Sequence, residues 1–91
     1  MKIVAVCGMG IGTSIILKMN TEKALRSLDA DADVEAADIG TARGAAQTAD
    51  LVLTSAELKD QLGDLPCEVV VIDNFVDVDE IESKLTDALG L

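Results

Sequence analysis

The fold is decided at residues 2–14, KIVAVCGMGIGTS, where a predicted strand runs directly into a glycine-rich loop. The stretch from Lys2 to Cys7 is almost continuously apolar, which is typical of a parallel strand that is covered on both faces. Gly8, Gly10 and Gly12 follow within five residues, and such a density of glycine disfavours both strand and helix. A strand, a glycine-rich loop and a helix in this order predict an α/β domain.

The remaining residues alternate between helical and extended patterns. Helices are predicted over residues 13–28, 42–48, 56–62 and 78–89, and further strands over residues 32–39, 51–54 and 68–73. We expect Thr13 or Ser14 to cap the first helix and Ser55 to cap the third. The β-α-β-α-β-α-β-α order predicts a single domain over residues 1–91, a three-layer α/β/α fold with a four-stranded parallel sheet in the order 2-1-3-4.

Two of these elements carry expectations about burial. In the first helix, the apolar residues at helical spacing are Ile16, Leu17, Ala24, Leu25 and Leu28. In the second strand, the alternation places Val34 and Ala36 on the buried side.

The composition excludes several classes of function. The chain has no His, so it has no Ser–His or Cys–His catalytic pair and no imidazole metal ligand. Its one aromatic residue, Phe75, leaves almost no surface on which bases stack, and a net charge of −10 repels nucleic acid and anionic membranes. No apolar stretch is long enough to span a membrane. We therefore expect a cytoplasmic protein that neither binds nucleic acid nor inserts into a membrane.

The loop after the first strand is the expected site. In open α/β sheets, ligands bind beyond the carboxyl ends of the strands, where the strand order reverses, which here lies between the first and third strands. A glycine-rich loop that leads into a helix presents backbone N–H groups to a tetrahedral anion. The phosphate-binding residues predicted in this way are Gly8, Met9, Gly10, Ile11, Gly12, Thr13 and Ser14.

Cys7 lies at the mouth of this predicted loop. The helix end and the N–H dipoles favour a thiolate, so we expect the pKa of Cys7 to lie below the ordinary cysteine value. A thiolate in a phosphate-binding loop can attack a phosphoryl group and hold it as S-phosphocysteine. The alternative is a structural cysteine beside an ordinary turn. Met9 and Ile11 are either contacts for a partner or buried residues.

Other phosphate-loop chemistries fit the residues less well. A Walker A loop needs a lysine directly before Thr13 or Ser14, and none is present. The dinucleotide fingerprint needs G-x-G-x-x-G, whereas the three glycines here are spaced by two and two. A small cysteine phosphatase needs an arginine where this chain has Thr13. Such a phosphatase, and a module that binds an anion or nucleotide without covalent chemistry, remain the alternatives.

The segment Ile3–Ser14, continued by Leu17-Lys18-Met19, resembles the IIB subunits of the bacterial phosphoenolpyruvate-dependent sugar phosphotransferase system, and its C-G-x-G-x-G-T-S pattern is most like the ascorbate branch. The resemblance implies a protein-cysteine phosphotransferase without metal or cofactor. Cys7 would accept a phosphoryl group from a phosphohistidine of a IIA partner and pass it to a sugar, L-ascorbate, on the membrane IIC subunit. The histidine then belongs to the partner, which fits its absence here.

Three further residues carry expectations. Cys67 begins the fourth strand whereas Cys7 ends the first, so a parallel sheet places them at opposite edges, which argues against a disulfide. Cys67 is expected in the core or at its rim. Asp38 and Asp73 follow the carboxyl ends of strands, where each either lines the site or is a solvated loop acid.

Overall fold

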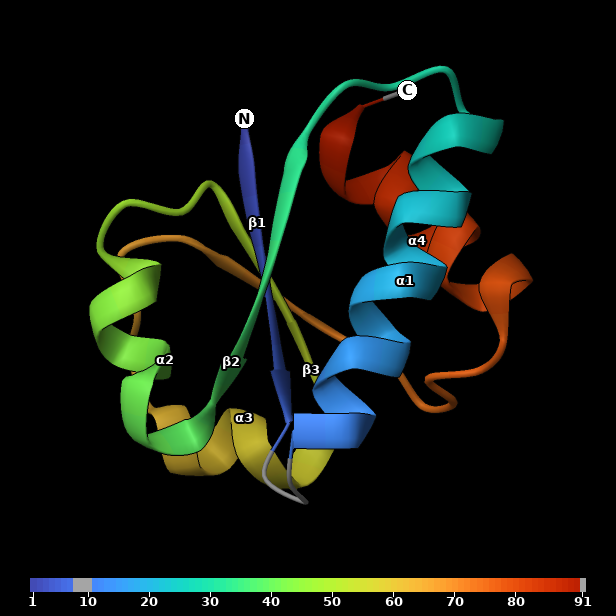
Figure 1. Cartoon of the computed structure of the whole chain (residues 1–91). Coiled ribbons are helices and arrows are strands. Elements are labelled where there is room, and N and C mark those ends of the chain that lie inside the picture. The colour runs from blue at the N-terminus through green and yellow to red at the C-terminus, as the bar shows by residue number, and fades with distance from the viewer. Residues whose placement is uncertain (8–10, 91) are drawn as a thin grey trace.

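The computed structural model describes residues 1–7 and 11–90, and for Cys7 and residues 11–14 it describes the backbone alone (Figure 1). Over these residues, four strands alternate with four helices, as predicted. The strands are β1 (Lys2–Cys7), β2 (Asp33–Asp38), β3 (Leu51–Thr54) and β4 (Glu68–Val71). The helices are α1 (Ile11–Ser27), α2 (Ile39–Ala46), α3 (Ala56–Leu62) and α4 (Val78–Leu89).

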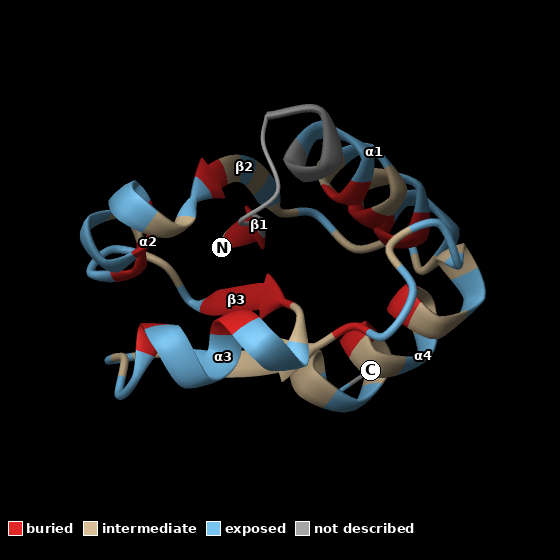
Figure 2. Cartoon of the chain, turned by 90° about the horizontal axis from the view of Figure 1, so that it is seen from below, coloured by how far each residue is buried: buried red, intermediate tan, exposed pale blue. Residues whose placement is uncertain are grey.

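The strands form one parallel sheet in the order β2-β1-β3-β4, which confirms the predicted topology. Figure 2 views the molecule from the edge at which β1 ends and shows α1 and α4 on one face of the sheet and α2 and α3 on the other. Each helix begins where a strand has just ended. The carboxyl ends of the strands therefore share one edge with the N-terminal ends of the helices.

The two central strands are buried on both faces. Ile3 and Ala5 of β1 pack into the cluster beneath α1 and α4, whereas Val4 and Val6 pack into the cluster beneath α2 and α3. This alternation explains the continuous apolar run that opens the sequence. Burying each such valine, leucine or isoleucine side chain contributes about 1.5–3 kcal/mol, so the double burial holds β1 firmly at the centre of the domain.

The start of α1 differs from the prediction. The helix begins at Ile11, so Thr13 and Ser14 lie in its first turn and the prediction that one of them is the N-cap was wrong. A glycine within a helix costs only about 1 kcal/mol relative to alanine, so Gly12 does not prevent the helix from starting before it. Ile16, predicted on the apolar face, is 43% exposed. The buried face instead includes Thr21, whose Oγ1 donates to the carbonyl oxygen of Leu17 at 2.7 Å.

Smaller differences occur along β2, α2 and β4. In β2, Val34 and Ala36 are only half-buried, and Ala37 is the buried residue. Helix α2 begins at Ile39 instead of Ala42, because the side chain of Asp38 caps it. Strand β4 ends at Val71, whereas β3, α3 and α4 have the predicted bounds.

Candidate functional site

The backbone of Cys7 ends the central strand β1, and its Cα partner on the neighbouring strand is Asp38 of β2. The strand order of the sheet reverses at β1, because β2 lies on one side of β1 and β3 lies on the other. Of the predicted phosphate-binding residues, Gly8, Met9 and Gly10 lie outside the described residues. The first turn of α1 is formed by the backbone of Ile11, Gly12, Thr13 and Ser14. The roles of the Cys7 sulfur and of this loop stay predictions.

The N-termini of α2 and α3 at this edge are occupied by the chain's own side chains. Asp38 caps α2, where its Oδ1 accepts from the backbone N–H of Thr41 at 2.9 Å and from the Thr41 hydroxyl at 3.1 Å. Ser55 caps α3 as predicted, with its Oγ accepting from the N–H of Leu58 at 3.4 Å. The first turn of α1 contains no acidic residue. Its partial positive charge is therefore not offset by a carboxylate from within that turn.

A buried hydroxyl holds the end of β1 in place. The Oγ1 of Thr54 donates to the carbonyl oxygen of Val6 at 3.3 Å, and the carbonyl oxygen of Thr54 accepts from the N–H of Ile72 at 2.8 Å. Thr54, the last residue of β3, therefore connects the penultimate residue of β1 with the residue that directly follows β4. No buried polar side-chain atom within the described part of the chain lacks a hydrogen-bond partner.

Asp73 lies in the loop between β4 and α4, whose backbone is held by Glu80 and Lys84 of α4. We call this pair of residues the Glu80–Lys84 clamp. The Glu80 carboxylate accepts from the N–H groups of Asp73 at 2.7 Å and Asn74 at 3.0 Å, and from Lys84 Nζ at 2.6 Å. Lys84 also donates to the carbonyl oxygen of Val71 at 2.6 Å. The Asp73 side chain itself is 81% exposed, with an oxygen 3.7 Å from Lys84 Nζ. Asp38 and Asp73 are thus a helix cap and a solvated loop acid in this structure.

The clamp shifts the titration of both of its charged members. Burial opposes ionisation of Glu80, but the hydrogen bonds from Lys84 and from the backbone of Asp73 and Asn74 outweigh it, so the pKa of Glu80 is lowered. The hydrogen bond to Glu80 raises the pKa of Lys84 against the opposing effect of burial. Sequence reasoning missed this pair, although glutamate four residues before lysine on a helix is a recognisable pattern.

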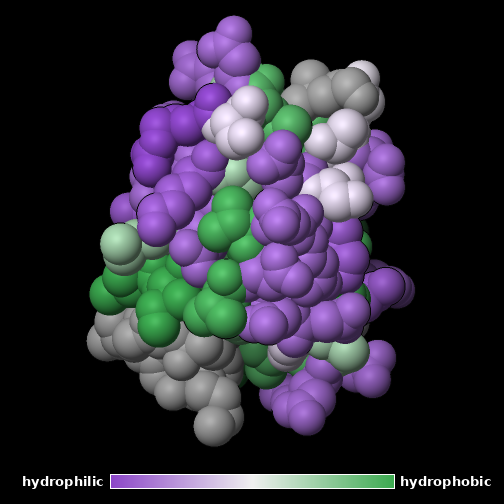
Figure 3. Space-filling model, turned by 90° about the vertical axis from the view of Figure 1, so that its right-hand side faces the viewer, coloured by the Kyte–Doolittle hydropathy of each residue, from purple (hydrophilic) through white to green (hydrophobic). Residues whose placement is uncertain are grey.

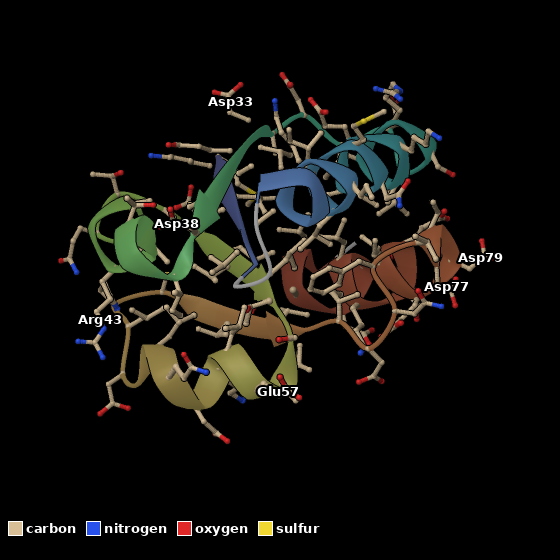
Figure 4. The ribbon with its side chains drawn as sticks, turned by 60° about the horizontal axis from the view of Figure 1, so that its bottom comes forward. Asp33, Asp38, Arg43, Glu57, Asp77 and Asp79 are labelled. Atoms are coloured by element: carbon tan, nitrogen blue, oxygen red, sulfur yellow. The ribbon has the colours of Figure 1, made fainter. Side chains whose placement is uncertain are left out.

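Both arginines lie away from the predicted phosphate loop. Arg26 is in the last turn of α1, at the far end of the helix from its start. Arg43 is in the last turn of α2, where it donates to the carbonyl oxygens of Leu62 at 3.1 Å and Gln61 at 3.3 Å. Figure 4 shows Arg43 on the outer side of α2. These positions place neither guanidinium where a cysteine phosphatase needs one.

Cys67 directly precedes β4, at the opposite edge of the sheet from the end of β1. Its half-buried side chain packs against the cluster beneath α2 and α3, which confirms its placement at the rim of the core. Burial, followed by the charge of Asp50, raises the pKa of the Cys67 thiol. Among the side chains that the structure describes, no three acidic or cysteine residues gather closely enough to hold a metal ion. None of the described helices has the length and apolar composition of a membrane span.

An exposed apolar surface lies beside the site. It is defined by Ile15, Ile16 and Met19 of α1, which are 44%, 43% and 52% exposed, and by Val76 of the β4–α4 loop, which is 66% exposed. Figure 3 shows hydrophobic side chains gathered on the face that α1 and α4 present. Sequence reasoning missed this surface. The signal was present, because residues 15 and 19 are one turn apart and fall opposite the buried Leu17 and Ala24.

Solved structures with the same architecture include sugar-specific IIB proteins. The lactose-specific IIB component domain of Streptococcus pneumoniae superposes with a TM-score of 0.63 at 14% identity, over 99% of this chain and 95% of that one. The cellobiose-specific IIB component of Borrelia burgdorferi superposes with a TM-score of 0.57 at 26% identity, over 97% of this chain and 86% of that one.

The sequence comparisons extend this likeness to the family. The Ascorbate-specific PTS system EIIB component of Mycoplasma pneumoniae is 33% identical over 88 residues, which are 96% of this chain and 93% of that protein. The family described as the lactose/cellobiose-specific IIB subunit of the PTS system matches residues 2–87. The chain therefore belongs to the IIB subunits of the sugar phosphotransferase system, which are its sugar-specific phosphotransferase components.

Proposed function

We propose that residues 1–91 act as the phosphoryl carrier between a IIA protein with a phosphohistidine and a membrane IIC subunit that holds the sugar, and that Cys7 is the phosphorylated residue. The position of Cys7 supports this most directly. It ends the central strand at the reversal of strand order, and α1 begins four residues later. Helix α1 is the helix that follows the cysteine, and its first turn carries no acid, whereas the N-termini of α2 and α3 are capped by Asp38 and Ser55.

The proposed chemistry is two successive displacements at phosphorus. In the first, the Cys7 thiolate attacks the phosphohistidine, the S–P bond forms, and the P–N bond breaks with its electron pair returning to the imidazole. In the second, a sugar hydroxyl oxygen attacks, the S–P bond breaks, the thiolate is regenerated and the hydroxyl proton leaves to solvent. The predicted phosphate loop would hold the phosphoryl oxygens through N–H and hydroxyl donors. Its residues are Gly8, Met9, Gly10, Ile11, Gly12, Thr13 and Ser14. Neither displacement requires a metal or an organic cofactor.

We propose L-ascorbate as the sugar and the cytoplasmic face of the membrane as the place of transfer. The relative named for ascorbate covers nearly the whole chain, and the C-G-x-G-x-G-T-S loop supports the same branch. The family description names lactose and cellobiose, so these disaccharides are the competing substrates.

The test of this proposal follows both displacements. The protein is phosphorylated from phosphoenolpyruvate through the general carrier proteins and the cognate IIA, and is then added to vesicles that contain the cognate IIC. We expect label to reach L-ascorbate but neither lactose nor cellobiose. Label on a disaccharide would overturn the sugar assignment, while saturable phosphate binding with an unchanged protein mass would favour a non-covalent anion-binding module.

A further inference from the structure

The apolar surface of Ile15, Ile16, Met19 and Val76 is concentrated at one place on a strongly charged chain. Five large apolar side chains are exposed in the described part of the chain, and four of them lie here. The fifth, Met1, lies at the opposite end of β1 from Cys7. Single exposed apolar residues need no explanation, but a group of them indicates an interaction site.

The surface is held rigidly from two sides. The Nδ2 of Asn20 donates to the carbonyl oxygen of Phe75 at 2.8 Å, which joins α1 beside Met19 to the loop beside Val76. The N–H of Val76 donates to Asn74 Oδ1 at 3.1 Å, and Glu80 holds the backbone of the same loop. A preorganised apolar group loses little conformational freedom when a partner covers it, so more of the contact energy appears as affinity.

Acidic residues border the surface on the α4 side. Asp77 directly follows Val76 and Asp79 comes two residues later, and Figure 4 shows both at the start of α4, on the outside of the molecule. Residues 77–89 contain five acidic residues and one lysine. On α1, the exposed Lys23 and Arg26 lie one and two turns beyond Met19, farther from the Cys7 edge. The half-buried Lys18 lies between Ile16 and Met19, so the negative charge beside the apolar side chains comes from the α4 side of the surface.

We infer that this surface docks on the cytoplasmic loops of the membrane IIC subunit, an inference that rests on the proposed function. Cytoplasmic loops of membrane proteins carry an excess of lysine and arginine, which complements the acidic border and the net charge of −10. The IIA partner instead arrives with a negatively charged phosphoryl group. The anionic cytoplasmic leaflet repels the chain as well, so the protein loops and not the lipids are the occupant.

The experiment separates the two transfer steps. The variants are the double substitution Met19→Ser with Val76→Ser, and Asp79→Asn; the matched controls are Gln61→Ser on α3 and Asp31→Asn between α1 and β2. Thermal unfolding establishes that each variant is folded. Intact mass then gives the rate of phosphorylation by phospho-IIA. The amount of labelled sugar formed by vesicles that contain IIC gives the rate of the second step. This rate is measured at a series of concentrations of the phosphorylated chain.

We expect the double variant to need about tenfold more protein for half-maximal sugar phosphorylation, with phosphorylation by IIA unchanged. Asp79→Asn should raise that concentration about two- to threefold at low salt and have no effect at high salt, while both controls behave as the wild type.

Other outcomes would overturn the inference. A loss confined to the first step would assign the surface to IIA, an equal loss in both steps would make it a surface shared by the two partners, and no loss in either would leave it without a docking role. Binding to protein-free anionic vesicles that the double variant abolishes would assign it to lipid. If the wild type accepts no phosphoryl group in the first step, the proposed function fails and this inference with it; if that step proceeds and the second is insensitive to the variants, the inference alone fails.

Discussion

The hydroxyl of Thr54, the last residue of β3, donates a buried hydrogen bond to the carbonyl oxygen of Val6 at 3.3 Å. The paired register of β1 and β3 ends one residue earlier, at Ala5 and Leu53. The side chain of Thr54 therefore extends the connection between the two strands to the residue that immediately precedes Cys7. This contact holds the Val6 end of β1 against β3, while β2 pairs with β1 as far as Cys7.

Replacing Thr54 with valine tests this contact. Thr54→Val keeps the shape of the side chain and removes the donor, so we expect the free energy of unfolding to fall by about 1 kcal/mol. We also expect slower phosphorylation of Cys7, because the strand end that carries the sulfur is less constrained. Urea unfolding and a time course of intact mass measure the two effects. Thr54→Ser, which keeps the hydroxyl, should restore the phosphorylation rate; an equally slow serine variant would contradict the positioning role.

The Glu80–Lys84 clamp predicts a defined pH dependence of stability. The pKa of Glu80 is lowered in the folded protein, so its contribution is complete above the ordinary glutamate value of 4.5 and is lost as the pH falls through the folded pKa. The pKa of Lys84 is raised, so its contribution is complete below 10.5 and is lost as the pH rises through the folded pKa. The clamp should therefore stabilise the fold fully between these two values.

Glu80→Gln removes the charge and should lower the free energy of unfolding at neutral pH by about 1–2 kcal/mol, because charge-assisted hydrogen bonds to two N–H groups and to Lys84 are weakened. The difference from the wild type should shrink as the pH falls below 4.5. Chemical unfolding at a series of pH values measures this, with Glu57→Gln on α3 as the control. A difference that is independent of pH would show that the clamp acts by shape alone.

Two glycines are predicted to respond in opposite ways to the same substitution. Gly63 ends α3 with φ +65° and ψ −148°, a conformation that residues with a Cβ rarely adopt, so Gly63→Ala should cost about 1–3 kcal/mol. Gly44 lies within α2, and a Cβ there would meet nothing within 4 Å, so Gly44→Ala should stabilise the protein by about 0.5–1 kcal/mol. Thermal unfolding of both variants checks this, and a stabilising Gly63→Ala would refute the strain argument.

Elements with local start and stop signals could be predicted from the sequence to the residue. Ser55 precedes α3 and Gly63 follows it, and α4 ends before Gly90 in a left-handed conformation. The strand β3 has only four residues, all buried, and three of them are apolar, so its pattern could not be mistaken for that of a helix. The parallel order followed from the alternation of elements, because right-handed crossovers leave few arrangements for four strands.

The error in α1 occurred where tertiary packing overrides the local pattern. The hydrophobic pattern of α1 includes two isoleucines at adjacent positions, and spacing alone could not show that Ile16 is exposed while Thr21 is buried and satisfied by the Leu17 carbonyl. The error at Asp38 has a different cause, because its carboxylate caps α2 by a local contact with the N–H of Thr41, and an aspartate directly before a helix is a recognisable capping signal.

The candidate site was predictable to the extent that its residues are contiguous in the chain. Cys7 and the glycine loop form one motif, and topology brings that motif to the end of the central strand. The contacts that shape the surroundings join distant segments: Thr54 to Val6, and Asn20 to Phe75. Such pairs are separated by about half the chain and leave no periodic signal in the sequence.

The role of Cys7 is decided by the intact mass of the protein after incubation with phosphoenolpyruvate, the general carrier proteins and the cognate IIA. We predict the addition of one PO₃ group to the wild type and to Cys67→Ser, and no addition to Cys7→Ser. Persistence of the added mass in Cys7→Ser, or its loss in Cys67→Ser, would contradict the assignment of Cys7 as the phosphoryl acceptor.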